Sequence, residues 1–141
     1  MIEINIPQKV QLILNILADQ GHEAYVVGGC VRDSLLGQKP QDWDICTSAL
    51  PQEVKKAFNG FPVLETGLKH GTVTVIIDRE PYEVTTYRIE GKYSDNRHPD
   101  RVEFVKNLEQ DLARRDFTIN AMAYNPMSGL VDYFNGLADL E

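Results

Sequence analysis

Apolar residues recur three and four positions apart over residues 7–20, a spacing that predicts an amphipathic helix. The apolar positions of this stretch are Val10, Ile13, Leu14 and Leu17. Gly21 follows as a stop signal. The short apolar run 24–27 then predicts a strand that leads directly into Gly28-Gly29, where a second short helix begins and continues to Gly37. The N-terminal part of the chain is therefore expected to form helix, strand and helix.

Polar and apolar residues alternate over 42–47 and predict a half-buried strand, and Pro51 predicts the first turn of another short helix. Two β-branched runs, 72–77 and 82–86, follow with a connection between them that is short enough for a β-hairpin. The polar segment 91–101 shows no period, so we expect a mobile loop there.

The last part of the chain predicts a strand at 102–105 and one helical stretch at 108–123. Asn135-Gly136 is typical of a turn, and the residues after it resemble the first turn of another helix. This order of elements predicts an α+β fold in which helices pack on one mixed β-sheet. A length of 141 residues allows one domain and little more.

Composition excludes several classes of protein. Hydrophobic residues make up 43% and charged residues 25% of the chain, as in an ordinary globular domain and unlike a disordered one. The net charge of −7 argues against nucleic-acid binding through a broad basic surface. A local cluster of arginines could still bind phosphate. No apolar run reaches the ~18 residues that a membrane span needs. Cys30 and Cys46 lie far apart, which favours reduced thiols in a cytoplasmic protein.

The first candidate cluster is Gly28-Gly29 with Arg32, placed between a predicted strand and a predicted helix. Glycines at such a turn let backbone N–H groups approach an anion, and the planar guanidinium of Arg32 suits phosphate. A tight turn with a surface Arg32 paired to Asp33 explains the same residues, and both interpretations stay open. A dinucleotide fold is disfavoured because GGCVRD lacks the G-x-G-x-x-G spacing.

The second cluster is the pair Asp42 and Asp44. On a strand, side chains two residues apart point to the same face about 6.5–7 Å from each other. Two carboxylates so placed suit one or two Mg²⁺ ions, whereas an isolated pair is more often a solvated strand edge. Glu83 favours the metal hypothesis, because it opens an apolar strand where an inward acid needs a partner. The sequence does not show whether that strand pairs beside Asp44.

The third cluster begins with the adjacent arginines Arg114 and Arg115. On a helix these two side chains point to different sides, so one can reach a site while the other stays outside. Asp116, Thr118 and Asn120 are poor choices for a helix interior and indicate a helix junction or a polar site lining. A solvated charged face is the alternative.

Five segments carry these clusters, namely 25–33 (YVVGGCVRD), 42–49 (DWDICTSA), 69–72 (KHGT), 83–88 (EVTTYR) and 114–121 (RRDFTINA). In this order they resemble the head domain of the class II tRNA nucleotidyltransferase (CCA-adding enzyme) and bacterial poly(A) polymerase family. Each segment alone is only moderately specific, whereas the ordered combination is highly specific.

The resemblance implies a nucleotidyltransferase head with a small mixed sheet and helices packed on it. It implies that Asp42 and Asp44 hold two Mg²⁺ ions and that Glu83 is the third carboxylate of the catalytic site. One ion would lower the pKa of the primer's 3′-hydroxyl, and the other would neutralise the triphosphate and the leaving pyrophosphate. The residues that match nucleotide-binding positions of the family are Gly28, Gly29, Arg32, Arg115, Asp116 and Asn120. Segment 91–101 matches the family's flexible loop.

The activity implied is template-independent addition of CMP and AMP, from CTP and ATP, to the tRNA 3′ end in the cytoplasm. Full-length members of the family continue into neck, body and tail domains, so residues 1–141 are expected to be a head-domain fragment without the base-selecting neck. A poly(A) polymerase, a CC-only enzyme and an A-only enzyme share the head segments and remain alternatives. A nucleotide-binding module without turnover is the alternative from another class.

Overall fold

The computed structural model describes residues 2–65, 67, 70–90 and 102–140. The helices are α1 (Gln8–Asp19), α2 (Gly29–Leu35), α3 (Pro51–Ala57), α4 (Leu108–Ala113), the 3₁₀ turn η2 (Thr118–Asn120) and α5 (Gly136–Leu140). The strands are β1 (Ala24–Val27), β2 (Asp44–Thr47), β3 (Val63–Leu64), β4 (Thr72–Ile77), β5 (Glu80–Thr86), β6 (Arg88–Glu90), β7 (Val102–Phe104), β8 (Ala123–Asn125) and β9 (Gly129–Val131).

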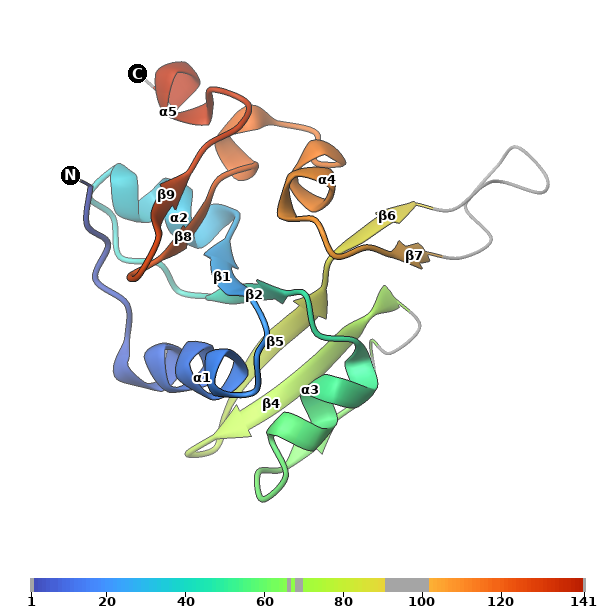
Figure 1. Ribbon diagram of the computed structural model, residues 1–141. Helices are drawn as coiled ribbons and strands as arrows, with labels where there is room; N and C mark the ends of the chain where they lie inside the picture. Colours follow the sequence, from blue (N-terminus) through green and yellow to red (C-terminus); the bar gives the residue numbers. More distant parts are fainter. Residues whose placement is uncertain (1, 66, 68–69, 91–101, 141) are drawn as a thin grey trace.

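Seven strands form one sheet in the order β3-β4-β5-β2-β1-β8-β9 (Figure 1). Strands β2 and β5 run parallel, and every other neighbouring pair in this sheet is antiparallel. The prediction of an α+β fold with a mixed sheet is therefore confirmed. Strands β6 and β7 form a separate two-stranded sheet that projects from the body beside α4 (Figure 1).

Apolar side chains cover both faces of the main sheet. On one face α1 and α3 bury Leu14, Leu17 and Val54 against residues such as Val73 and Val75. On the other face Leu108 and Leu112 of α4 pack with a second cluster that is smaller, formed by Val27, Cys46, Tyr87, Ala121 and Ala123. This second cluster leaves the outer face of β4 and β5 uncovered by α4. Thr74 and Glu83, which line the site described below, point to that face.

The β4–β5 hairpin turns tighter than the sequence indicated, because β5 already begins at Glu80 and pairs with Ile77. Only Asp78 and Arg79 remain in the turn, with φ of 49° and 71°. Positive φ at both central residues matches the right-handed twist of the strands, and Asp tolerates that conformation. The hairpin register that results sets which side chains face Glu83.

The expectation of one helix over 108–123 is wrong. Helix α4 ends at Ala113, and Phe117 has an extended backbone with φ −120° and ψ 137° before η2 begins. The apolar run after Asn120 then joins the sheet as β8, which pairs with β1. Burial of this run against the sheet outweighs its moderate helix propensity.

The strand expected at 42–47 begins only at Asp44. Trp43 is buried in the core while Asp42 and Asp44 on either side of it are exposed, so the expected alternation holds up to Ile45. It fails after that residue, because Cys46 and Thr47 are both buried, and the strand is therefore not half-buried as expected. Among the described residues, no helix is long and apolar enough to cross a membrane. The expected mobile loop at 91–101 lies outside the described residues.

Both cysteines are free and buried. Burial raises the pKa of the Cys30 thiol to about 11, and it raises the pKa of Cys46 as well. A thiol with a raised pKa is a poor nucleophile, so neither cysteine is suited to covalent catalysis.

Candidate functional site

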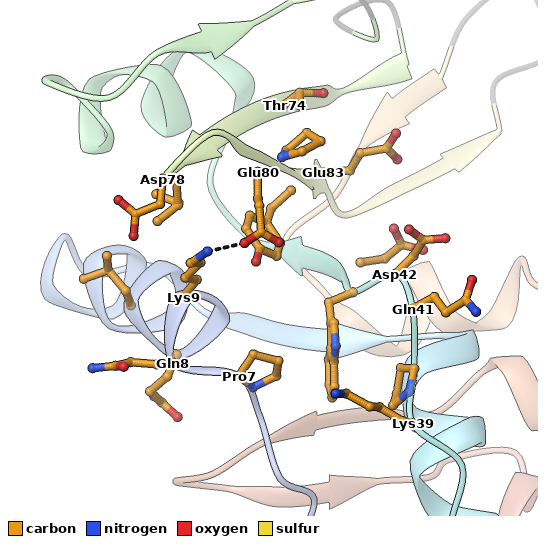
Figure 2. Close-up of a pocket in the computed structure, with 18 of the residues that line it drawn as sticks. Pro7, Gln8, Lys9, Lys39, Gln41, Asp42, Thr74, Asp78, Glu80 and Glu83 are labelled. Atoms are coloured by element: carbon orange, nitrogen blue, oxygen red, sulfur yellow. Dashed lines mark hydrogen bonds and ion pairs between the residues drawn. The ribbon is translucent and has the colours of Figure 1, made fainter.

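Three carboxylates lie at the junction of β2 and β5. Because Ile45 pairs with Val84 in parallel register, Asp44 and Glu83 stand side by side at the start of the paired segments. Asp42 precedes them in the segment that leads into β2. All three side chains line one open cleft of about 1260 Å³ between the β4–β5 hairpin and the start of α1. Figure 2 shows Asp42 and Glu83 at one side of this cleft and Lys9, paired with Glu80, at the other.

The carboxylates repel one another. The pKa of Asp44 is raised, first because neighbouring atoms remove part of its hydration and then because of the negative charges of Glu83 and Asp42. The guanidinium of Arg115 acts in the opposite direction and lowers this pKa. A bound cation would relieve the repulsion, and carboxylate oxygens are the ligands that hard divalent ions prefer.

The fit to a metal rests on this donor chemistry. Within the described part of the chain, no group of three or more His, Cys, Asp or Glu side chains is gathered closely enough to hold a metal ion. The carboxylates therefore supply oxygen donors and unrelieved negative charge, while a finished coordination sphere would require their side chains to move together.

The turn after β1 brings two guanidinium groups against the backbone. Gly28 has φ 84° and ψ −135°, a conformation that glycine adopts freely, and its carbonyl accepts the N–H groups of Val31 and Arg32. A Cβ atom on Gly28 would lie 3.4 Å from Nη1 of Arg115, and one on Gly29 would lie 3.2 Å from Nη2 of Arg32. The two glycines thus leave room for both arginines.

Arg32 is held from two sides. Its Nε donates to Oδ1 of Asp33 at 3.0 Å, and its Nη1 donates to Oδ1 of Asn120 at 2.8 Å. The Asp33 pair is the contact that the surface-arginine alternative predicted. The side chain is nevertheless partly buried, and the bond to Asn120 joins α2 to η2, 88 residues further along the chain. The guanidinium of Arg32 is therefore fixed by two hydrogen bonds beside the glycine turn.

Arg114 and Arg115 both turn toward one buried carboxylate, that of Asp111. Nε of Arg114 lies 3.5 Å from Oδ1, and Nη2 of Arg115 lies 3.7 Å from Oδ2. The expectation that these arginines point to different sides of a helix is wrong, because α4 ends at Ala113 and Arg114 is already its C-cap. Arg115 still differs from Arg114, since it alone also lies against Gly28 and lowers the pKa of Asp44.

Asp111 is a functional candidate that the sequence analysis missed. Its side chain is 1% exposed, and Oδ1 accepts the backbone N–H of Arg88 at 2.9 Å. Among the described residues, Oδ2 of Asp111 and the Nε atoms of both arginines have no hydrogen-bond partner. The spacing of an acid three and four residues before two arginines is the signal that could have identified this cluster.

The structure thus gathers most of the residues that the sequence singled out. Gly28, Gly29, Arg32, Arg115 and Asn120 form one group, which we call the arginine–glycine group. The carboxylates of the cleft form the other, and Arg115 connects the two through its effect on Asp44. Asp116 is the exception: it is exposed between α4 and η2, and no hydrogen bond or ion pair within the described chain joins it to either group.

Comparison with known proteins gives a consistent result. Residues 24–141 match the family described as poly A polymerase head domain. The chain is 50% identical over 140 residues to the CCA-adding enzyme of Lactobacillus johnsonii, covering 97% of this chain and 35% of the relative. It therefore spans about a third of the length of the curated relatives that it matches.

Two solved structures are similar to the chain. One is the Bacillus stearothermophilus CCA-adding enzyme in complex with CTP, with a TM-score of 0.81 and 42% identity over 94% of this chain and 31% of that one. The other is a tRNA nucleotidyltransferase complexed with a primer tRNA and an incoming ATP analog. Its TM-score is 0.65, with 34% identity over 91% of this chain and 36% of that one.

Proposed function

Because the chain belongs to the family of poly A polymerase head domains, we propose that it is the catalytic head of a tRNA 3′-end nucleotidyltransferase. The reaction transfers CMP or AMP from CTP or ATP to the tRNA 3′-hydroxyl. The hydroxyl oxygen forms a bond to the α-phosphorus, its proton is lost to solvent, and pyrophosphate leaves with the electron pair of the broken P–O bond. The CCA-adding relatives and the CTP and tRNA complexes among the similar structures support this assignment.

The observation that carries the proposal is the pairing of β2 with β5 beside the arginine–glycine group. Asp42 and Asp44 would hold two Mg²⁺ ions, with Glu83 as the third carboxylate. Ions bound there would lower the pKa of the attacking hydroxyl and neutralise the charge of the leaving pyrophosphate. Oxygen donors that repel one another support this choice of cation.

The arginine–glycine group would hold the incoming nucleotide. Arg32 and Arg115 offer planar donor forks to the phosphates, and Gly28 and Gly29 let those phosphates approach the backbone. Asn120 keeps Arg32 in position through its hydrogen bond, and we assign Asp116 to the rim of the same site. No side chain acts as a nucleophile, since in-line phosphoryl transfer depends on positioning and charge stabilisation.

We further propose that residues 1–141 form the head of a longer protein, in line with the third of the relatives' length that they match. Base selection and most of the tRNA affinity would then come from the other parts. The free, buried cysteines agree with a reaction in the reducing cytoplasm.

Calorimetric titration of the chain with ATP and with CTP tests the site directly. We expect similar Mg²⁺-dependent binding of both nucleotides, and we expect Asp44→Asn to weaken it. Asp78→Asn is the matched control, because Asp78 is an acid of the same cleft at the tip of the β4–β5 hairpin. Binding that is indifferent to Mg²⁺ and to Asp44→Asn would contradict the metal assignment.

Turnover is tested in the complete protein with a tRNA that lacks its terminal CCA. Pyrophosphate release that depends on the tRNA would exclude a nucleotide-binding module without turnover. Sequencing of the products would separate addition of CCA from addition of CC, of A or of poly(A). Activity retained by Asp44→Asn would refute the catalytic role of this residue.

A further inference from the structure

A second, smaller pocket opens beside Glu83, on the side away from Asp44. It has a volume of about 330 Å³ and is lined by Gly67, His70, Thr72, Thr74, Glu83 and Arg88. Thr74 and Glu83 also line the large cleft, so the two cavities meet at these side chains. The sequence analysis and the function proposed above assign no role to the threonines of this pocket.

Sheet order places the pocket and the arginine–glycine group on opposite sides of the carboxylates. Thr74 of β4 pairs with Glu83 of β5, Glu83 stands beside Asp44 of β2, and Asp44 pairs with Val27 of β1. Paired residues of neighbouring strands point to the same face. Thr74, Glu83, Asp44 and Val27 therefore form one row across the sheet, and Gly28 follows directly after Val27.

The polar character of the pocket follows from the alternation along β4. Val73, Val75 and Ile77 are buried in the core, whereas Thr72 and Thr74 face outward. The hydroxyl groups of Thr72 and Thr85 lie 2.9 Å apart and hold each other in place. A threonine hydroxyl both donates and accepts hydrogen bonds, as a ligand hydroxyl requires.

Arg88 brings a positive charge to the lining of the pocket, which also contains the negative charge of Glu83. Nη1 of Arg88 donates to the backbone carbonyl of His70, which ties the guanidinium to the chain just before β4. Gly71, which follows His70, has φ 85°, and a Cβ atom there would lie 2.6 Å from the ring of Phe104. Glycine at this position thus lets β7 pack closely against the wall. Hydroxyls and a guanidinium that line one pocket are chemically complementary to a ribose and a phosphate.

We propose that this pocket holds the terminal nucleotide of the RNA primer, with its ribose at Thr74 and Thr72 and its 5′-phosphate at Arg88 and His70. The inference rests on the function proposed above. In-line transfer requires the attacking oxygen and the leaving pyrophosphate to lie on opposite sides of the α-phosphorus. Since the arginine–glycine group receives the triphosphate on the β1 side, the primer reaches the carboxylates from the β4 side.

The test uses the complete protein and a short RNA primer, so that remote tRNA contacts do not mask the terminal one. Thr74→Val removes the hydroxyl and keeps the shape of the side chain. We expect kcat/KM for the primer to fall about five- to tenfold, as for one lost hydrogen bond, with KM for the nucleotide unchanged. Ser128→Ala, in the exposed turn between β8 and β9 near the other edge of the sheet, should change neither parameter.

A primer with a 2′-deoxy terminal residue removes the other partner of the proposed hydrogen bond, so that the protein change and the primer change can be compared singly and together. The wild-type protein should lose a similar factor with this primer, and Thr74→Val should lose nothing further. Arg32→Lys should show the opposite pattern, a raised KM for the nucleotide with an unchanged KM for the primer. Thr72→Val repeats the test at the neighbouring hydroxyl, and thermal melting shows that each variant is folded.

The outcomes separate the two proposals. A folded wild-type protein that extends no RNA would overturn the proposed function itself. A wild-type protein that extends RNA, together with Thr74→Val and Thr72→Val variants that respond to the 2′-deoxy primer as strongly as wild type, would overturn the primer pocket alone.

Discussion

Asp44 stands in unfavourable electrostatic surroundings at the junction of β2 and β5. Partial desolvation and the charges of Glu83 and Asp42 all raise its pKa, and only Arg115 opposes them. Such an arrangement lowers the stability of the metal-free fold and is retained where it serves binding. Asp44 therefore links stability, pH and metal binding at a single side chain.

We predict that Asp44→Asn raises the Tm of the metal-free protein at neutral pH. Because the folded-state pKa of Asp44 is raised, its contribution to stability is fully present below the unfolded-state pKa and is lost as the pH rises through the folded-state pKa. The difference in Tm between variant and wild type should therefore grow from about pH 4 to about pH 7. Thermal melts in chelator across this range measure it, and a difference that shrinks with rising pH would contradict the repulsion.

Substitution of the two arginines that pair with Asp111 should separate effects on stability from effects on nucleotide binding. We predict that Arg114→Gln and Arg115→Gln each destabilise the fold by about 1–3 kcal/mol, because each leaves the buried carboxylate less compensated. Only Arg115→Gln should also weaken nucleotide binding, since Arg115 alone lies against Gly28 and acts on Asp44.

Urea unfolding measures the first effect and titration with CTP in Mg²⁺ measures the second. Equal losses of CTP affinity in Arg114→Gln and Arg115→Gln would show that the arginines act on the site only through the fold.

At the scale of elements, the segment from α4 to α5 decides the geometry of the arginine–glycine group. Residues 114–121 leave the helix, form η2 and so present Asn120 to Arg32. Helix α5 packs against η2, and the Thr118 hydroxyl donates a hydrogen bond to Asp139. The sequence indicated a junction here through its polar residues, but a continuous helix was also expected. Only the pairing of β8 with β1 excludes that helix.

We predict that Gly136→Ala destabilises the protein by about 2 kcal/mol. In an open helix this change would stabilise by about 1 kcal/mol, but here a Cβ atom would lie 2.2 Å from the backbone oxygen of Thr118. Chemical denaturation measures the loss, with Ala138→Ser on the exposed side of α5 as a control expected within about 0.5 kcal/mol of wild type. A gain in stability would show that α5 does not pack closely on η2.

For the molecule as a whole, the net charge is negative, whereas the proposed nucleotide site is positively charged. The chain has a net charge of −7, yet Arg32 and Arg115 lie together at the glycine turn, where an anionic substrate is proposed to bind. A local cluster on an acidic domain favours a small polyphosphate over a long polyanion, because the distant carboxylates repel an extended backbone.

We predict that these 141 residues alone bind tRNA weakly and with a shallow salt dependence. With two or three cationic side chains at the site, log K against log salt should have a slope no steeper than about −3. Fluorescence anisotropy with labelled tRNA at several salt concentrations measures this slope. A slope near −6 would reveal a broad basic surface that the composition does not suggest.

The sequence by itself determined the features whose causes are local. The spacing of Val10, Ile13, Leu14 and Leu17 predicted α1, and the β-branched runs predicted β4 and β5, because periodicity reflects which face of one element is buried. The resemblance of five ordered segments indicated the family, and the match of residues 24–141 confirms it. The residue roles within the site stay predictions.

Only the tertiary structure decided which distant segments meet. The parallel pairing of β2 with β5 sets Glu83 beside Asp44, and the path through η2 brings Asn120 to Arg32. The burial of the Asp111 carboxylate against the backbone of Arg88 and the position of Thr74 beside Glu83 likewise depend on packing between elements. The physical reason is that strand partners and register are chosen by burial of whole faces, which no single stretch of sequence encodes.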